Sequence, residues 1–235
     1  MVAWRIFARY SMREFFAKYK TLGWTLLVLS IIIIYLIQDA LRPEAVLPVY
    51  QPAQFDPSLV DSTVTHIKRY HTIADFSLTN QNGQTVTQDF YKDKIYVADF
   101  FFTTCPTICP IMTKNMALLQ QELLNDKDVL LLSHTVTPDI DSVPQLKKYA
   151  EEKGVIDSKW NLVTGEKKQI YELARKSYLA AKSNGDGGPF DMIHTENFIL
   201  VDKEKRIRGT YDGTNKEAMY ELLEDIRILQ NSYQE

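Results

Sequence analysis

The sequence predicts an α/β fold, in which helices flank a central mixed sheet and one membrane-spanning helix precedes them. Two apolar runs, "IYVADFFF" and "DVLLLSHTV", are typical of strands that are buried on both faces. Segments with helical spacing follow such runs, and turn signals indicate hairpins near both ends of this region. Alternating strands and helices, together with hairpins, indicate one mixed sheet covered by helices.

The first element is a membrane-spanning helix at residues 22–37, "LGWTLLVLSIIIIYLI". This run contains no charged residue, and Trp24 and Tyr35 stand near its ends, as interfacial anchors do. Basic residues precede the run and few follow it, so the positive-inside rule places the N-terminus in the cytoplasm. We therefore predict a basic cytoplasmic tail at 1–21 and a single-pass anchor in the inner (cytoplasmic) membrane, with the domain in the periplasm.

Three other interpretations exist for the N-terminal segment. A cleaved signal peptide needs small residues at a cleavage site, and "QDALRPEAV" offers no good small-x-small pair. An organellar transit peptide would instead lead to the mitochondrial inner membrane, with the domain facing the intermembrane space. A buried helix of a globular protein fits the flanking residues poorly.

After the span, residues 38–65 contain four of the nine prolines and show no clear period, which predicts an extended linker. Residues 66–235 are then expected to form one folded unit. The net charge of −3, without a basic stripe, gives no indication of nucleic-acid binding.

The folded unit is expected to begin with a hairpin that turns at Asn82-Gly83, because residues on both sides alternate between apolar and polar. Strands at 95–102 and 128–136 follow. Between them, residues 109–125 show helical spacing of apolar residues at Met112, Met116, Leu119 and Leu123.

A helix at 142–154 should come next, with Ser142 as its N-cap and Gly154 as its C-cap. A short strand at 160–165 and a helix at about 167–178 lead into the Gly-rich loop "NGDGGPF". The segments "HTENFILVD" and "RIRGTYDG" predict a second hairpin. The last helix has a core face made of Met219, Leu222, Leu223, Ile226 and Leu229.

The stretch "TTCPTICPIM" holds both cysteines of the chain, Cys105 and Cys109. Pro106 suits the first turn of a helix, so we expect the helix to begin beside Cys105 and both sulfurs to lie at its N-terminus. The helix dipole would then lower the pKa of both thiols. In a regular helix the two Cα atoms would be about 6 Å apart.

Several roles remain open for this pair on spacing alone. The two thiols could cycle between dithiol and disulfide, or they could chelate a soft metal such as Cu(I) with a third ligand. A structural disulfide over so short a loop would constrain the unfolded chain little. Structural zinc would need four ligands, and the four histidines are widely scattered.

The four histidines differ in how well their expected positions suit a third metal ligand. His66 and His71 are expected to be exposed, and His134 to be a satisfied, half-buried residue of a strand. His194 stands where the Gly-rich loop meets a strand, which is a frequent location of sites in α/β folds.

Together these segments resemble the Sco/SenC family, which comprises membrane-anchored copper chaperones with a thioredoxin-like fold. The resemblance covers about residues 73–230 and rests on "FSLTNQNG", "FFTTCPTICP", "WNLVTG", "HTENFILVD" and "TYDGT", which occur in family-like order. It implies that Cys105, Cys109 and His194 are ligands of Cu(I) and Cu(II). It also implies delivery of copper to the copper-bearing subunit of cytochrome c oxidase, with other copper chaperones or thiol reductants as further partners.

The chain departs from the family pattern at three positions. Many relatives carry Asp where this chain has Thr107. An Asp-Pro-x-Arg-Asp segment of the family corresponds here to residues 137–141, with Thr137 in place of Asp and Ile140 in place of Arg. The ligand set itself is intact.

The resulting prediction is a copper chaperone that has no catalytic turnover of its own. The alternative is a thiol-disulfide oxidoreductase that reduces an apo-oxidase or a cytochrome, with Cys105 as nucleophile and Cys109 as resolving thiol. Three residues separate these cysteines, whereas dedicated oxidoreductases usually have two, which argues against a general role in disulfide exchange. A peroxidase is a weaker alternative, because no further catalytic group accompanies the thiols.

Overall fold

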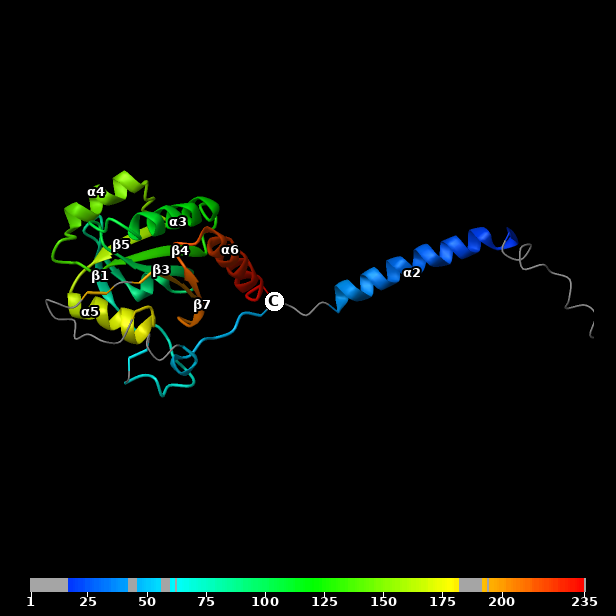
Figure 1. The fold of residues 1–235 in the computed structure, drawn as a ribbon, viewed down its shortest axis with the longest axis horizontal. Helices are drawn as coiled ribbons and strands as arrows, with labels where there is room; N and C mark the ends of the chain where they lie inside the picture. The colour runs from blue at the N-terminus through cyan, green and yellow to red at the C-terminus, as the bar shows by residue number, and fades with distance from the viewer. Residues whose placement is uncertain are drawn as a thin grey trace, which may run out of the picture. The chain divides into compact units, whose positions relative to one another are not determined.

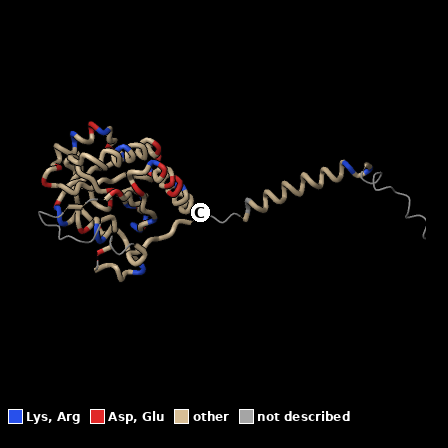
Figure 2. The backbone as a smooth tube through the Cα atoms, in the orientation of Figure 1, with Lys and Arg blue, Asp and Glu red and all other residues tan. Residues whose placement is uncertain are grey.

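The structure is a computed structural model that describes residues 17–41, 46–55, 60–61, 63–181, 192–193 and 195–234. The chain forms two compact units, residues 1–45 and residues 46–235. Helix α2 (Lys20–Ala40) belongs to the first unit. By length and composition its segment Lys20–Gln38, with a mean hydropathy of 2.1, can cross a membrane, a property that signal sequences share. Charged residues are coloured near the start of α2 and not along its middle (Figure 2).

The second unit is built on a mixed sheet, as predicted. In the described part of the chain its strand order is β2-β1-β5-β4-β3-β6-β7. The central strands β3, β4 and β5 are parallel, and the outer pairs are antiparallel. The strands are β1 (Ser77–Asn80), β2 (Thr85–Thr87), β3 (Ile95–Phe101), β4 (Val129–Thr135), β5 (Trp160–Thr164), β6 (Asn197–Val201) and β7 (Ile207–Asp212).

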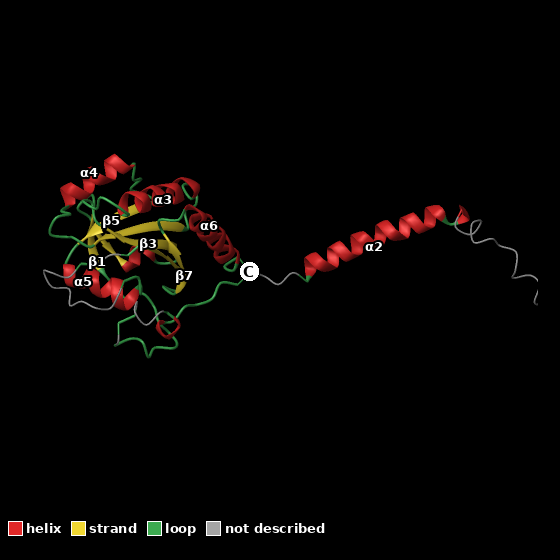
Figure 3. Cartoon of the chain, viewed as in Figure 1, coloured by secondary structure: helices red, strands yellow, loops and turns green. Residues whose placement is uncertain are grey.

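Helices cover both faces of the sheet (Figures 1 and 3). One hydrophobic cluster packs the sheet against α3 (Cys109–Glu122), α4 (Val143–Lys153) and α6 (Lys216–Asn231). A second cluster lies on the opposite face, beneath α5 (Lys167–Glu172) and the π-helical turn η3 (Leu173–Ser177). Two short 3-10 turns, η1 (Pro52–Gln54) and η2 (Gln88–Tyr91), complete the described helical elements.

Most predicted elements are confirmed. The first hairpin turns at Gly83, whose φ of 73° is readily available to glycine. Gly154, with a φ of 70°, ends α4 as predicted, whereas Ser142 occupies the N-cap position without a capping hydrogen bond from its side chain. The buried face of α6 consists of the five residues that the spacing indicated. The helix predicted at 167–178 is divided into α5 and the turn η3.

The predicted start of the helix beside Cys105 is wrong, because α3 begins at Cys109. A helix that began at Pro106 would hold Pro110 in its interior. There Pro110 could not donate to the carbonyl of Pro106, and its ring would clash with that carbonyl. Pro110 is tolerated only in the first turn, so residues 102–108 form a loop.

Part of the predicted linker packs on the domain. The Arg208 side chain donates to the carbonyl oxygens of Leu47 and Pro48, at 2.6 and 2.9 Å. Val60 is buried in the cluster beneath α5, and the side-chain oxygen of Gln51 accepts from the main-chain N–H of His71. The compact unit therefore begins at Val46, before the predicted boundary at residue 66.

A chain that starts at His66 should consequently be less stable than one that starts at Val46. The shorter chain loses the burial of Val60 and leaves polar groups of Arg208 and His71 without partners, which should lower Tm by roughly 5–10 °C. Thermal unfolding followed by circular dichroism measures the difference. Equal Tm values would show that residues 46–65 contribute nothing to the stability of the domain.

Candidate metal and thiol site

The two cysteines lie at the edge of the sheet where the parallel strands end. Cys105 belongs to the loop that follows β3, and Cys109 is the first residue of α3. Both are free thiols and both are buried, with 8% of Cys105 and 3% of Cys109 exposed. Ligand sites of α/β proteins favour this edge, because the loops after neighbouring parallel strands meet there.

The two thiols differ strongly in acidity. Burial opposes ionisation of Cys105, but hydrogen bonds from the main chain of Cys109 and Thr107, and from the side chains of both residues, outweigh it. They lower the pKa of Cys105 to about 7. Burial and the neighbouring Cys105 instead raise the pKa of Cys109 to about 12, and the negative charge of Asp99 contributes to this rise.

The prediction that both thiols are acidic is therefore correct for Cys105 and wrong for Cys109. Two main-chain N–H groups, those of Thr107 and Cys109, favour the thiolate of Cys105, whereas one, that of Phe102, favours the thiolate of Cys109. Cys109 is the more deeply buried of the two cysteines, and its burial outweighs the hydrogen bond from the Phe102 main-chain N–H, so the charged form is disfavoured. The Thr107 hydroxyl stands 3.8 Å from the Cys105 sulfur, so Thr107 places a neutral hydrogen-bonding group there rather than a second negative charge.

A buried carboxylate holds the loop that carries Cys105. Asp141, which is fully buried, accepts hydrogen bonds from the main-chain N–H and the hydroxyl of Thr103. The hydroxyls of Thr135 and Thr137 also donate to it. Thr137, one of the departures from the family pattern, thus supplies a donor to Asp141. Asp141 is the last residue of the 137–141 segment, but nothing in that local pattern reveals contacts with a residue 38 positions earlier.

A second buried carboxyl, Asp99 of β3, lies on the same face of the sheet as Cys109. It neighbours Ser133 of β4 in register, and its Oδ1 atom has no hydrogen-bond partner among the described residues. Burial raises the pKa of Asp99 to about 7. The apolar run in which it stands predicts only a buried strand, so nothing in the sequence points to a role for this carboxyl group.

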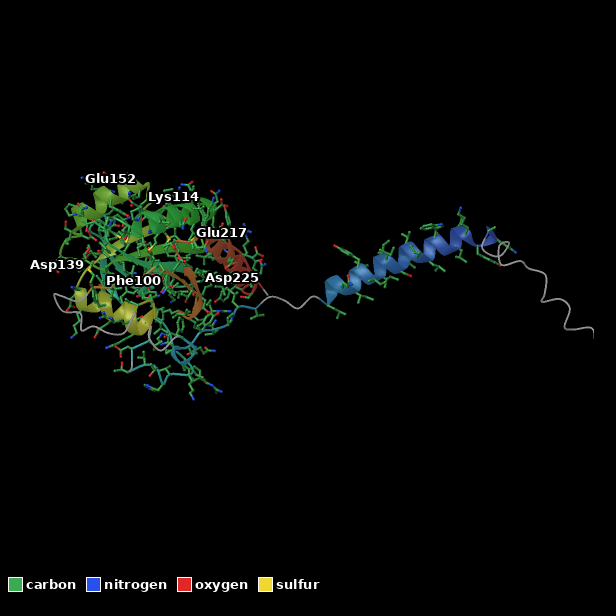
Figure 4. All side chains as sticks on the ribbon, viewed as in Figure 1. Phe100, Lys114, Asp139, Glu152, Glu217 and Asp225 are labelled. Atoms are coloured by element: carbon green, nitrogen blue, oxygen red, sulfur yellow. The ribbon has the colours of Figure 1, made fainter. Side chains whose placement is uncertain are left out.

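The described residues include three of the four histidines. His66 is exposed as predicted, but His71 is buried and its Nε2 lies 2.7 Å from the carbonyl oxygen of Ser177. His134 is completely buried rather than half-buried, and it stacks on Phe100, which lies inside the domain (Figure 4). Its Nδ1 is 3.3 Å from the Asp99 carbonyl oxygen, while Nε2 has no partner among the described residues. Burial lowers the pKa of His134 to about 4, so this ring is neutral.

His194 lies outside the described residues, and so does the Gly-rich loop at 184–190. The adjoining Thr195 is described, and its hydroxyl donates to the carbonyl oxygen of Ala180. Ala98 of β3 pairs with Ile199 of the antiparallel strand β6, so the chain enters β6 at the edge where β3 ends. The described residues alone contain no group of three Cys, His, Asp or Glu that could hold a metal ion.

Comparisons with known proteins agree with this architecture. The family model described as SCO1/SenC matches residues 64–229. The SCO1 protein homolog of Bacillus subtilis (strain 168) is 32% identical over 159 residues, which cover 67% of this chain and 82% of that protein.

Solved structures support the predicted thioredoxin-like fold. The structure of BsSco, a member of the Sco family of cytochrome c oxidase assembly proteins in which a disulfide switch was identified, is 31% identical. It has a TM-score of 0.58 and covers 68% of this chain and 93% of its own. Arabidopsis thaliana ScoI, solved with copper bound, shares the fold at 23% identity, with a TM-score of 0.51 and coverage of 66% of this chain and 99% of its own.

The difference in acidity predicts selective alkylation. Near pH 7 iodoacetamide should modify Cys105 at least about 100-fold faster than Cys109. The thiolate fraction of Cys105 is far larger, and the greater nucleophilicity of the less acidic thiolate offsets only part of this difference. The rate at Cys105 should rise with pH around a midpoint near 7. Peptide mass spectrometry locates the modification, and the denatured chain, in which both thiols should react alike, is the control. Equal modification of both cysteines in the folded protein would contradict the assignment.

Proposed function

Since the chain belongs to the SCO1/SenC family, we propose that it is a membrane-anchored copper chaperone. It would deliver copper to the dinuclear copper centre of cytochrome c oxidase while that enzyme is assembled. The observation that carries the proposal is the pair of free, buried thiols, Cys105 and Cys109, at the carboxyl edge of the parallel strands. The role of BsSco in oxidase assembly and the copper bound to A. thaliana ScoI support it.

The proposed ligands of the copper cargo are Cys105, Cys109 and His194. Thiolate sulfur is a soft ligand that favours Cu(I), whereas an imidazole nitrogen suits Cu(II). The acidic thiol of Cys105 would bind first at neutral pH, and binding would displace the proton of Cys109. His194 would have to approach from the segment that precedes Thr195, and the pairing of β6 with β3 favours such an approach.

The proposed location is the inner membrane of a bacterium, with the domain in the periplasm. The apolar helix α2 serves as the single-pass anchor, and the basic residues before it favour a cytoplasmic N-terminus. The copper-bearing subunit of the oxidase is the proposed recipient. Copper would pass to it by exchange of ligands, since each thiolate can be replaced in turn by a ligand of the recipient.

A second candidate function is thiol-disulfide exchange with an apo-oxidase or a cytochrome. The pKa difference between the thiols favours it, because an exchange protein needs one thiolate that attacks and a second thiol that resolves the mixed disulfide. Cys105 has the acidity of the attacking group, and Cys109 is the resolving group.

Copper binding to the full chain in detergent tests the first proposal. The reduced protein should bind about one copper ion per chain, and the oxidised protein should bind none at this site, because a disulfide removes both thiolates. Metal analysis after gel filtration gives the stoichiometry. Equal copper uptake by a Cys105→Ser/Cys109→Ser double variant would refute the proposed ligands.

The variant His194→Ala separates the two candidate functions. Disulfide exchange needs no imidazole, so the equilibrium constant for exchange with glutathione should stay close to that of the wild type. Cu(II), in contrast, loses its nitrogen ligand, so the thiolate-to-Cu(II) charge-transfer band and support of oxidase assembly should both be lost. If His194→Ala retains full oxidase assembly while changes of Cys105 or Cys109 abolish it, the exchange function is favoured.

A further inference from the structure

Residues 102–108, which include Cys105, have no regular structure of their own. The end of the segment is tied to α3, because the N–H groups of Ile111 and Met112 donate to the carbonyl oxygen of Ile108. Its start, residues 102–105, makes few hydrogen bonds to main-chain carbonyl groups of the described residues. Val136 donates to the carbonyl oxygen of Phe101 at 2.8 Å, and Cys105 donates to that of Phe102 at 3.3 Å. Between these points the position of the loop depends on side chains.

Asp141 supplies the missing support. Its Oδ1 accepts from the Thr103 hydroxyl, and its Oδ2 accepts from the Thr103 main-chain N–H at 3.2 Å. Oδ2 also accepts from Thr135 at the end of β4 and from Thr137 in the following loop. The carboxylate thus joins the cysteine loop to the neighbouring parallel strand.

The network extends to α4 as well. Gln145 donates from Nε2 to the Thr103 hydroxyl oxygen at 3.1 Å, so Thr103 is held from both α4 and Asp141. Asp141 is completely buried, and its four donors among the described residues are three hydroxyls and a main-chain N–H. A buried carboxylate held in this way requires its donors to stay in place, because a lost donor leaves charge without a partner. Displacement of Thr103 is therefore costly.

We propose that Asp141, acting through Thr103, is the positioning residue that holds the Cys105 sulfur close to Cys109. The inference deepens the proposed function, because it concerns the same two sulfurs. A disulfide forms only within a narrow range of Cβ separations, and a chelated metal also needs both sulfurs together. Holding the loop in place therefore favours both the disulfide and the two-sulfur metal complex.

The test is the exchange of the full chain with glutathione disulfide in the absence of copper. In this reaction the two cysteine thiols form one S–S bond, and the S–S bond of glutathione disulfide is broken to give two glutathione thiols. Loosening the loop in Asp141→Asn or Thr103→Val should make the protein disulfide at least about tenfold less favourable, which corresponds to a potential about 30 mV more oxidising. Thr103→Ser, which keeps the hydroxyl, should restore the wild-type constant within about twofold.

The matched control is Asp202→Asn. Asp202 is another buried carboxylate, and it accepts from the main-chain N–H groups of Glu204 and Arg206 and from the Arg206 and Arg208 side chains. It follows Val201, which pairs with Tyr96 near the start of β3, so it lies at the opposite edge of the sheet from the cysteines. Asp139, in the loop that also holds Asp141, lies on the side of the domain away from Asp225 of α6 (Figure 4). Asp202→Asn should lower Tm and leave the exchange constant unchanged.

Two results would overturn the proposal. One is a folded Thr103→Val variant whose exchange constant is within about twofold of the wild type. The other is an equal shift in Asp202→Asn, which would attribute the effect to general loss of stability. Thr103→Val also keeps the test decisive if Asp141→Asn does not fold. Because the assay contains no copper, a wild-type protein that bound no copper would refute the proposed function and leave this inference standing.

Discussion

Pro110 has no main-chain N–H, and inside a helix its ring would clash with the carbonyl group four residues earlier. Helix α3 therefore begins at Cys109 and cannot extend back to Cys105. The segment between β3 and α3 remains a loop, whose free N–H groups at Thr107 and Cys109 turn toward the Cys105 sulfur. The acidity of Cys105 follows from this restriction on the backbone, whereas Cys109, the first residue of the helix, is the more deeply buried of the two cysteines and stays protonated.

A loop without regular structure needs support from elsewhere if it is to hold a reactive sulfur in one place. The fold supplies it from the next parallel strand, because β3 and β4 run in register and end at the same edge of the sheet. Asp141 follows β4 and reaches Thr103, which follows β3. The site therefore depends on the parallel arrangement of these strands. An antiparallel neighbour would begin at this edge of the sheet, and the loop that follows it would lie at the opposite edge.

The sequence was sufficient to predict the fold because its patterns are local. Apolar runs marked the buried strands β3 and β4, Gly83 marked a turn, and five spaced apolar residues marked the core face of α6. The resemblance to a known family then supplied the thioredoxin-like arrangement, which spacing alone did not give. The predicted helix start beside Cys105 is wrong because Pro106 favours a first helical turn at that point, whereas Pro110 prevents a helix that already includes Pro106.

The parts of the site that sequence reasoning missed depend on long-range contacts. Asp99 looks like any residue of a buried strand, and Asp141 looks like any loop residue, until the fold brings them near the cysteine loop. The same is true of the two thiols, which have similar neighbours in the sequence and opposite pKa shifts in the structure. This asymmetry serves either proposed function. The thiolate of Cys105 attacks a metal complex or a disulfide first. Cys109 is still protonated at that stage, and it completes the exchange only after the first bond has formed.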